Sequence, residues 1–179
     1  MDALHCQICG SPTQAAAIEG RERRRCATCG WVHWLNPASA AAGLVLWERR
    51  VLLVRRAIAP CHGMWALPAG FQEIDEPAAL AVEREVREEC GIAVRVGALH
   101  DLVWVPEGHR PANVAVYRCT PLAFDLRPGP DVLDAAWFSL DQLPLELAFS
   151  NGPRILWPLR DAHGPAGRDG AGGGAPPGP

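Results

Sequence analysis

The sequence predicts an α/β domain that follows a small module built around a metal ion. Short apolar segments typical of strands flank one amphipathic segment long enough for a helix, and a second helical segment closes the pattern, as in layered α/β domains. Two C-x-x-C pairs lie ahead of these segments and indicate a separate metal-binding module. With 179 residues, 49% of them hydrophobic, the chain is long enough for both parts.

Four cysteines define the first module, which we place at residues 1–36. Each pair is followed at once by a glycine, which permits a tight turn, and the pairs are Cys6 with Cys9 and Cys26 with Cys29. Four thiolates suit tetrahedral Zn²⁺ in a closed structural site, where metal binding supplies most of the folding free energy. The spacing resembles a zinc ribbon, and a redox pair or an iron–sulfur site are the alternatives.

A run of four arginines at residues 21–25 lies between the two cysteine pairs. Such a cluster could contact the phosphates of a nucleic acid. Glu19 and Glu22 dilute its charge, which favours a solvated hairpin tip. The net charge of −3 also gives the chain no general attraction to nucleic acids or anionic membranes, so we expect neither as a partner.

The α/β domain, expected over residues 37–162, should begin with a hairpin. Residues 43–47 and 51–54 are short, apolar and rich in branched side chains, and the charged residues 48–50 separate them. The irregular segment 60–70 follows and ends in Pro68 and Gly70, which shape a loop ahead of the helix.

The helix should have recognisable ends. Asp75 or Glu76 is expected to cap it, Pro77 fits its first turn, and Gly91 can take the left-handed conformation that ends a helix. Apolar residues at helical spacing form a stripe that should face a sheet: Ala79, Val82, Val86 and Cys90.

The same helix carries three glutamates on one face. Glu85, Glu88 and Glu89 stand at i, i+3 and i+4, so their side chains lie together. Crowded carboxylates repel one another unless a counter-charge is present, and a hard divalent cation such as Mg²⁺ supplies one. A solvated acidic face with an ion pair between Arg84 and Glu88 is the alternative.

Further strands are expected at residues 93–96, 99–105, 113–119 and 135–138. The loop at 106–111 carries Glu107 and His109, residues 141–144 suggest a turn or the start of a short helix, and residues 149–159 form a last element. Residues 163–179 are rich in glycine and proline and should be disordered.

The segment at residues 70–92 resembles the Nudix box at every defined position. The matching residues are Gly70, Glu76, Arg84, Glu85, Glu88, Glu89, Gly91 and the apolar Ile92. A motif with so many fixed positions rarely arises by chance. The resemblance implies an α/β/α sandwich with a mixed sheet, and a hydrolase that uses Mg²⁺ or Mn²⁺ to cleave a phosphoanhydride in a nucleoside diphosphate linked to another group.

The resemblance also implies roles for these residues. Arg84 would orient the neighbouring carboxylates, and Glu76 would hold Arg84 in place. Bound cations would neutralise the diphosphate and lower the pKa of a water molecule that attacks phosphorus. The cation ligands would be the backbone carbonyl of Gly70 and the carboxylates of Glu85, Glu88 and Glu89.

The general base and the substrate contacts have several candidates. Asp134 resembles the acidic position that the family places before an aromatic pair, and Asp131 and Glu107 are its rivals; a solvated carboxylate is the alternative for each. Substrate stacking or substrate binding is considered for four further residues, although the aromatic ones could equally belong to the core: Trp65, Trp104, Tyr117 and Arg55.

Weaker likenesses bear on the substrate. A zinc ribbon ahead of a Nudix domain resembles NADH pyrophosphatases, but their run similar to SQPWPFPxS is missing, since residues 100–114 read HDLVWVPEGHRPANV. Residues 36–37, 51–60, 65–71, 128–130 and 147–150 resemble small zinc-ribbon Nudix proteins related to plant FAD and ADP-ribose pyrophosphatases. We therefore expect hydrolysis of ADP-ribose, FAD or a similar compound, with release of AMP.

Other functions stay open at this point. They are an NADH or NAD-cap pyrophosphatase, an RNA-binding protein of the decapping type, and a nucleotide-sensing regulator without activity. No export signal and no apolar run of about 18 residues is present, so we expect a cytoplasmic protein without a membrane partner. The expected partner is a small nucleotide, and a homodimer is one candidate assembly.

Overall fold

The computed structural model describes residues 4–108 and 110–162. It divides the chain into two compact units, Met1–Asn36 and Pro37–Pro179, and the division falls where the cysteine module was expected to end. Each unit has its own sheet. The expected disorder of residues 163–179, as well as His109, lies outside the described residues.

The first unit is a three-stranded antiparallel sheet with the order β1-β2-β3. Its strands are β1 (Thr13–Ile18), β2 (Arg21–Cys26) and β3 (Val32–His33). The arginine run forms strand β2 rather than the hairpin tip that the sequence suggested, and the tip is the turn at Glu19 and Gly20. Arg24 donates from Nε to Oγ1 of the buried Thr13 at 3.0 Å, which holds β2 against β1.

The second unit contains a seven-stranded mixed sheet with the order β10-β5-β4-β9-β8, in which β6 pairs with β5 and β7 with β4. Strands β4 and β9 run parallel, and the other pairs run antiparallel, which confirms the expected mixed sheet. The strands are β4 (Ala38–Trp47), β5 (Arg50–Arg56), β6 (Trp65–Ala66), β7 (Ala69–Phe71), β8 (Val94–Val105), β9 (Ala112–Pro121) and β10 (Val132–Ser139).

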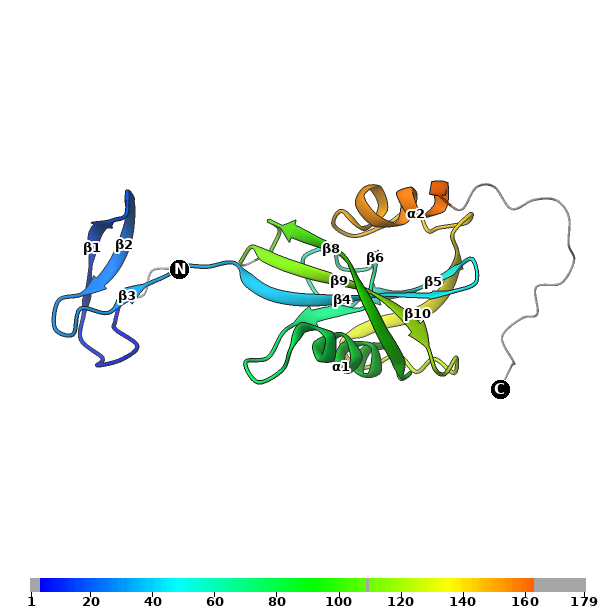
Figure 1. Ribbon diagram of the computed structural model, residues 1–179, viewed down its shortest axis with the longest axis horizontal. Helices are drawn as coiled ribbons and strands as arrows, with labels where there is room; N and C mark the ends of the chain where they lie inside the picture. The colour runs from blue at the N-terminus through cyan, green and yellow to red at the C-terminus, as the bar shows by residue number, and fades with distance from the viewer. Residues whose placement is uncertain (1–3, 109, 163–179) are drawn as a thin grey trace, which may run out of the picture. The chain divides into compact units, whose positions relative to one another are not determined.

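Helices cover both faces of this sheet, so the second unit is the expected α/β/α sandwich (Figure 1). Helix α1 (Ala78–Cys90) packs on one face, and the other face is covered by a π-helical turn, η1 (Asn151–Leu156), that continues into α2 (Trp157–Ala162). Side chains along β4 alternate between the two cores: Ala41 and Val45 contact the α1 side, whereas Ala42 and Leu44 belong to the core that contains Leu156.

Helix α1 differs from the sequence prediction at its first residues. Pro77 occupies the N-cap position and no side chain caps the helix, so the expected cap at Asp75 or Glu76 is wrong. The physical reason is that the Glu76 carboxylate accepts hydrogen bonds from Arg84 and from the backbone N–H of Glu73. Gly91 ends the helix in the left-handed conformation, as expected.

The buried stripe of α1 packs very closely against β4. It consists of Ala81, Val82, Val86 and Cys90, so Ala81 takes the buried place expected for Ala79, which is only half-buried. A Cβ atom at Gly43 would lie 2.9 Å from Cγ2 of Val86, closer than such atoms approach in proteins. The absence of a side chain at Gly43 therefore lets the helix cross the strand.

Strand β8 joins two predicted strands into one. It runs through residues 93–96 and 99–105 of the prediction, and shifts in register against β9 occur between Val96 and Leu99 and again before Asp101. A bulge keeps both halves on the same partner strand. Residues 141–144 form a turn and not the start of a helix.

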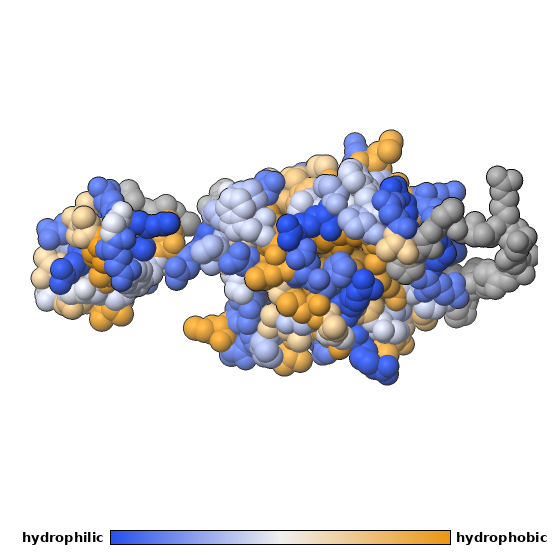
Figure 2. Space-filling model, turned by 45° about the horizontal axis from the view of Figure 1, so that its top comes forward, coloured by the Kyte–Doolittle hydropathy of each residue, from blue (hydrophilic) through white to orange (hydrophobic). Residues whose placement is uncertain are grey.

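The surface of the second unit carries hydrophobic side chains interspersed with hydrophilic ones on the face shown in Figure 2. Among the described residues, no helix has the length and apolar character needed to cross a bilayer.

Candidate functional site

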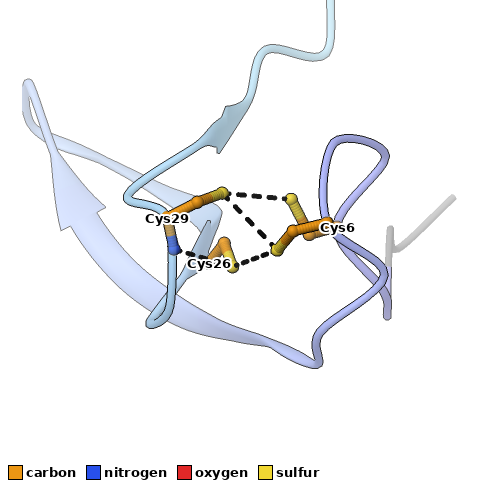
Figure 3. Close-up of side chains that lie close together, drawn as sticks. Cys6, Cys26 and Cys29 are labelled. Atoms are coloured by element: carbon orange, nitrogen blue, oxygen red, sulfur yellow. Dashed lines mark hydrogen bonds between the residues drawn. The ribbon is translucent and has the colours of Figure 1, made fainter.

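The four cysteines of the first unit converge on one point (Figure 3), and their Sγ atoms all lie within 4.8 Å of one another. The Sγ atoms of Cys6 and Cys29 are 3.5 Å apart, as are those of Cys9 and Cys26. Tetrahedral Zn²⁺ with Zn–S bonds of about 2.3 Å separates its sulfur ligands by roughly 3.8 Å. All four thiols are free, so their chemistry and spacing fit a zinc ion, and the group contains no histidine among the described residues.

Backbone geometry prepares this site for thiolates. The N–H groups of Ile8 and Cys29 point at the Sγ atoms of Cys6 and Cys26, at 3.4 and 3.5 Å. Hydrogen bonds from the side chain and backbone of Ser11 lower the pKa of Cys9 to about 6. A backbone hydrogen bond from Trp31 lowers the pKa of Cys29, but burial and the neighbouring thiols outweigh it and raise that pKa. A metal ligand must be deprotonated, so the two N–H groups and the lowered pKa of Cys9 favour metal binding.

In the second unit, Arg84 connects α1 to the loop before it. Its Nη2 donates to Oε1 of Glu76 at 2.6 Å and to the carbonyl oxygen of Phe71 at 3.0 Å. Its Nη1 donates to Glu85 at 2.6 Å and to Glu88 at 3.1 Å. These bonds, with that to Glu76 first, raise the pKa of Arg84, so it stays charged and fixes the carboxylates around it.

Glu85 lies directly against the loop strand β7. A Cβ atom at Gly70 would be only 2.0 Å from Oε1 of Glu85, so glycine is the residue that leaves room for this carboxylate. Burial raises the pKa of Glu85, and the contact with Arg84 opposes that shift. The Glu85 carboxylate therefore packs directly against the backbone of Gly70.

Glu89 is the most deeply placed of the three glutamates. It accepts a hydrogen bond from the backbone N–H of Ala69 at 2.9 Å. Burial is the main cause that raises the pKa of Glu89 to about 8; Glu85 and Asp131 raise it further, while Ala69 and Arg56 lower it. The Glu88 side chain, in contrast, is 58% exposed.

The three carboxylates do not form a preassembled cluster like that of the cysteines. Within the part of the chain that the structure describes, the only group of three or more such ligands with all donor atoms within 4.8 Å is the cysteine group. Arg84 attracts Glu85 and Glu88, whereas the Ala69 N–H holds Glu89 on the other side. The site therefore consists of hard oxygen donors whose charges the protein itself partly neutralises.

A cavity of about 760 Å³ opens on the face of the sheet opposite α1. Strands β4, β8 and β9 supply its apolar floor, and Ala69 and Gly70 line the wall that adjoins Glu89 and Glu85. Its volume lies in the range of small-molecule sites. Polar side chains on its wall include Arg56, Gln72, Glu107, Arg110 and Asn151.

The predicted substrate contacts receive little support from this geometry. The Trp65 ring packs edge-on against Phe138, with ring centroids 4.7 Å apart, and Tyr117 packs against the core on the α1 side. Arg55 donates to the carbonyl oxygen of Gly63, and neither it nor Trp65 nor Tyr117 lines the cavity. Their roles in substrate binding stay predictions.

Sequence reasoning missed Arg56. Leu52 and Val54 of β5 belong to the core on the α1 side, so alternation along the strand assigns Arg56 to that side and Arg55 to the opposite face. Arg56 nevertheless lines the cavity together with Phe149, and Arg55 does not. Arg56 is the last residue of β5, and alternation along the strand does not indicate that its side chain reaches the cavity.

The candidates for the general base lie at different places. Asp134 is exposed on β10 opposite Arg55, and its carboxylate accepts the N–H of Ala135 at 2.8 Å. Glu107 lines the cavity, and the charge of Asp131 raises the pKa of Glu89. The identity of the general base stays a prediction.

Fold and site together define an α/β/α protein with a glutamate-rich helix beside a cavity large enough for a nucleotide. Residues 37–157 match the NUDIX domain, so the chain belongs to the Nudix family and is a Nudix pyrophosphohydrolase that acts on nucleoside diphosphate derivatives.

Known proteins similar to this chain include two enzymes whose names state a substrate. An "ADP-ribose pyrophosphatase" of Methanocaldococcus jannaschii is 33% identical over 120 residues, which are 66% of this chain and 70% of the relative. An "NAD-capped RNA hydrolase NudC" of Chromobacterium violaceum is 32% identical over 84% of this chain. This chain spans only 56% of that NudC relative.

A solved structure extends the similarity to most of the chain. The NUDIX hydrolase from Nitrosomonas europaea superimposes with a TM-score of 0.77 at 31% identity, and the match covers 92% of this chain and 94% of that one. This share is larger than residues 37–179 alone, so the match includes part of the cysteine module.

Proposed function

We propose that the chain hydrolyses the pyrophosphate bond of ADP-ribose, or of a similar compound such as FAD, and releases AMP. The observation that carries the proposal is the junction at Ala69 and Gly70, which line the cavity on one side and contact Glu89 and Glu85 on the other. A nucleotide in the cavity would present its pyrophosphate at this junction. The name of the Methanocaldococcus jannaschii relative supports ADP-ribose as the first substrate to test.

Mg²⁺ or Mn²⁺ fits the donor set at this junction. Carboxylate and carbonyl oxygens are the ligands that these hard cations prefer, and Glu85, Glu88, Glu89 and the Gly70 carbonyl would hold them. When bound, the cations supply charge neutralisation of the pyrophosphate and acidification of water. We assign Zn²⁺ to the four cysteines as a structural ion.

The chain's own residues position the reaction. Arg84 restrains Glu85 and Glu88 through its two bonds from Nη1, and Glu76 restrains Arg84 in turn. The Ala69 N–H fixes Glu89 at the edge of the cavity. Asp134, or one of its rivals Asp131 and Glu107, would accept the proton of the attacking water; Glu107 lines the cavity.

A substrate panel tests the proposal. The full chain is incubated with ADP-ribose, FAD and NADH in Mg²⁺ or Mn²⁺, and the products are separated by chromatography. We expect AMP and ribose 5-phosphate from ADP-ribose, and a loss of at least 100-fold in kcat for Glu88→Gln. Glu83→Gln, on the same helix but outside the glutamate cluster, is the matched control and should keep its activity. Equal activity of the two variants would refute the assignment of the site.

A second candidate substrate is NAD-capped RNA. The NudC relative matches 84% of this chain, more than residues 37–179 alone, so the likeness includes part of the cysteine module. NAD-capped RNA therefore belongs in the same panel, next to free NADH. Faster hydrolysis of the capped RNA than of ADP-ribose would replace the first proposal with the second.

A further inference from the structure

Arg56 is the last residue of β5 and lines the cavity. Its backbone closes the following loop: the N–H donates to the carbonyl oxygen of Met64 at 3.0 Å, and the carbonyl accepts from Gly63 at 2.8 Å. The position of the side chain at the cavity wall is therefore set by the sheet and by the loop together.

Two contacts within the protein fix the guanidinium of Arg56, one at Nε and one at the face of the group. Nε donates to the carbonyl oxygen of Pro60 at 3.0 Å, and Cζ lies 4.9 Å from the centre of the Phe149 ring. Among the described residues, neither terminal Nη atom has a protein partner. A planar group that is fixed at Nε and on one face, with both Nη atoms open, is arranged to bind two oxygens of a phosphate.

Phe149 is itself held in an unusual conformation. Its φ of 52° lies in the left-handed region, which is unfavourable for a bulky residue. The segment before it is fastened to β6, because Trp65 accepts the N–H of Ala148 at 2.8 Å and donates its own N–H to Glu146 at 2.8 Å. The fold thus tolerates strain at the residue that supports Arg56.

Arg56 shares its cavity with the segment that contacts the glutamate helix. Ala69, whose N–H binds Glu89, lines the same cavity as Arg56. Arg110, the other arginine on the cavity wall, already has an interaction within the protein.

We propose that Arg56, supported by Phe149 and Pro60, binds the substrate phosphate that faces away from the glutamate helix and so holds the pyrophosphate across the junction at Ala69 and Gly70. This inference rests on the proposed pyrophosphate chemistry of the site. It makes Arg56 a substrate-binding residue whose guanidinium contacts phosphate oxygens.

Binding of a diphosphate that cannot be hydrolysed tests the role of Arg56 without catalysis. The probe is α,β-methylene-ADP, titrated calorimetrically into the full zinc-loaded chain with Mg²⁺, and adenosine is the probe without phosphate. Arg56→Gln should weaken binding of α,β-methylene-ADP roughly 10- to 100-fold and leave adenosine unchanged, because charged hydrogen bonds to phosphate are lost. Arg95→Gln is the matched control, since Arg95 is an exposed arginine of β8 that does not line the cavity.

Kinetics and folding distinguish binding from a structural role. With ADP-ribose, Arg56→Gln should raise KM by a similar factor with less than a tenfold change in kcat, and Arg56→Lys should recover part of the loss. Phe149→Leu should weaken the binding of α,β-methylene-ADP several-fold, while the midpoint of thermal unfolding stays close to that of the wild type. The proposal would be overturned if Arg56→Gln weakened the binding of both probes equally, or if Arg95→Gln and Arg56→Gln had equal effects.

The same titration separates the two proposals. A wild-type chain that binds α,β-methylene-ADP in an Arg56-dependent way but leaves ADP-ribose intact would refute the proposed substrate and keep the role of Arg56. If the wild-type chain hydrolyses ADP-ribose and Arg56→Gln leaves its KM unchanged, the proposed substrate is kept and the role of Arg56 is refuted.

Discussion

The three glutamates of α1 have unequal environments, and this inequality assigns them different tasks. Glu88 is mostly exposed, Glu85 is wedged against Gly70, and Glu89 is buried beside the Ala69 N–H. The Glu88 carboxylate can therefore be solvated by water, whereas contacts with the protein hold the carboxylates of Glu85 and Glu89 in fixed positions. A cation that binds all three must compete with Arg84 for two of them.

The pKa of Glu89 predicts a pH dependence of stability before catalytic cations bind. The unfolded chain ionises this carboxyl near pH 4.5 and the folded chain only near pH 8, so the folded state holds more protons in between. The free energy of unfolding should therefore fall as the pH rises from about 4.5 to 8, by roughly 2–5 kcal/mol. Urea unfolding of zinc-loaded protein without Mg²⁺, at several pH values, measures this slope.

Two variants isolate the contribution of Glu89. Glu89→Gln cannot ionise and should lose that part of the slope, whereas Glu83→Gln should keep it. Saturating Mg²⁺ should also flatten the slope of the wild type, because a cation stabilises the ionised form. A slope that Glu89→Gln leaves unchanged would contradict the buried position of this carboxyl.

Gly70 permits the closest approach in the site. Because an added Cβ would lie 2.0 Å from Oε1 of Glu85, Gly70→Ala must displace this carboxylate. We expect a loss of kcat of at least 100-fold and a destabilisation of about 1–3 kcal/mol. Gly97→Ala on β8, where the added Cβ meets only a backbone oxygen at 3.2 Å, is the control and should keep its activity. Steady-state kinetics and thermal unfolding measure both quantities.

At the scale of elements, local sequence signals predicted most of the fold that positions the site. The box helix, its end at Gly91 and the strands on both sides of it follow from periodicity and turn residues. The first turn of the helix was predicted wrongly because Glu76 binds Arg84, eight residues further on, and not the helix terminus. Local rules for helix caps do not include such a competing partner.

The cavity could not be predicted in the same way. Its walls come from segments far apart in the chain, such as Ser39 on β4, Val103 on β8 and Phe149 before η1. Arg56 lines it at the end of β5, although alternation along the strand places Arg56 with Leu52 and Val54 on the α1 side. For this reason the sequence located the glutamates, which share one helix, but selected Arg55 in place of Arg56.

The packing of α1 on β4 predicts that two residues far apart in the sequence affect the free energy of unfolding in a coupled way. Gly43→Ala should destabilise the second unit by about 1–3 kcal/mol, because the added Cβ would lie 2.9 Å from Cγ2 of Val86. Val86→Ala alone leaves a cavity and should cost a similar amount. The double variant should be more stable than the sum of the two effects predicts. Val86→Ala makes room for the Cβ that Gly43→Ala adds, and this Cβ fills part of the space that Val86→Ala leaves. Urea unfolding of all four proteins measures the coupling, and simple additivity would contradict the close contact.

At the scale of the whole molecule, the chain consists of two units with separate sources of stability. The first unit has a small sheet, and among its described residues the buried hydrophobic ones are Cys6 and Cys26, so the proposed zinc ion would supply most of its folding free energy. The second unit has two apolar cores on the faces of its sheet. Loss of zinc should therefore affect the two units very differently.

Cys9→Ser tests this difference. We expect it to remove the bound zinc, measured by elemental analysis, and to abolish the protected amides of β1 and β2 in hydrogen exchange. The second unit should keep its protected amides and its midpoint of unfolding, because α1 and the mixed sheet pack on their own cores. Hydrolysis of ADP-ribose should stay within about twofold of the wild type, since the residues lining the cavity all belong to the second unit.

Cys61→Ser, outside the cysteine group, controls for the loss of a thiol. A loss of activity in Cys9→Ser but not in Cys61→Ser would show that the first unit takes part in the site.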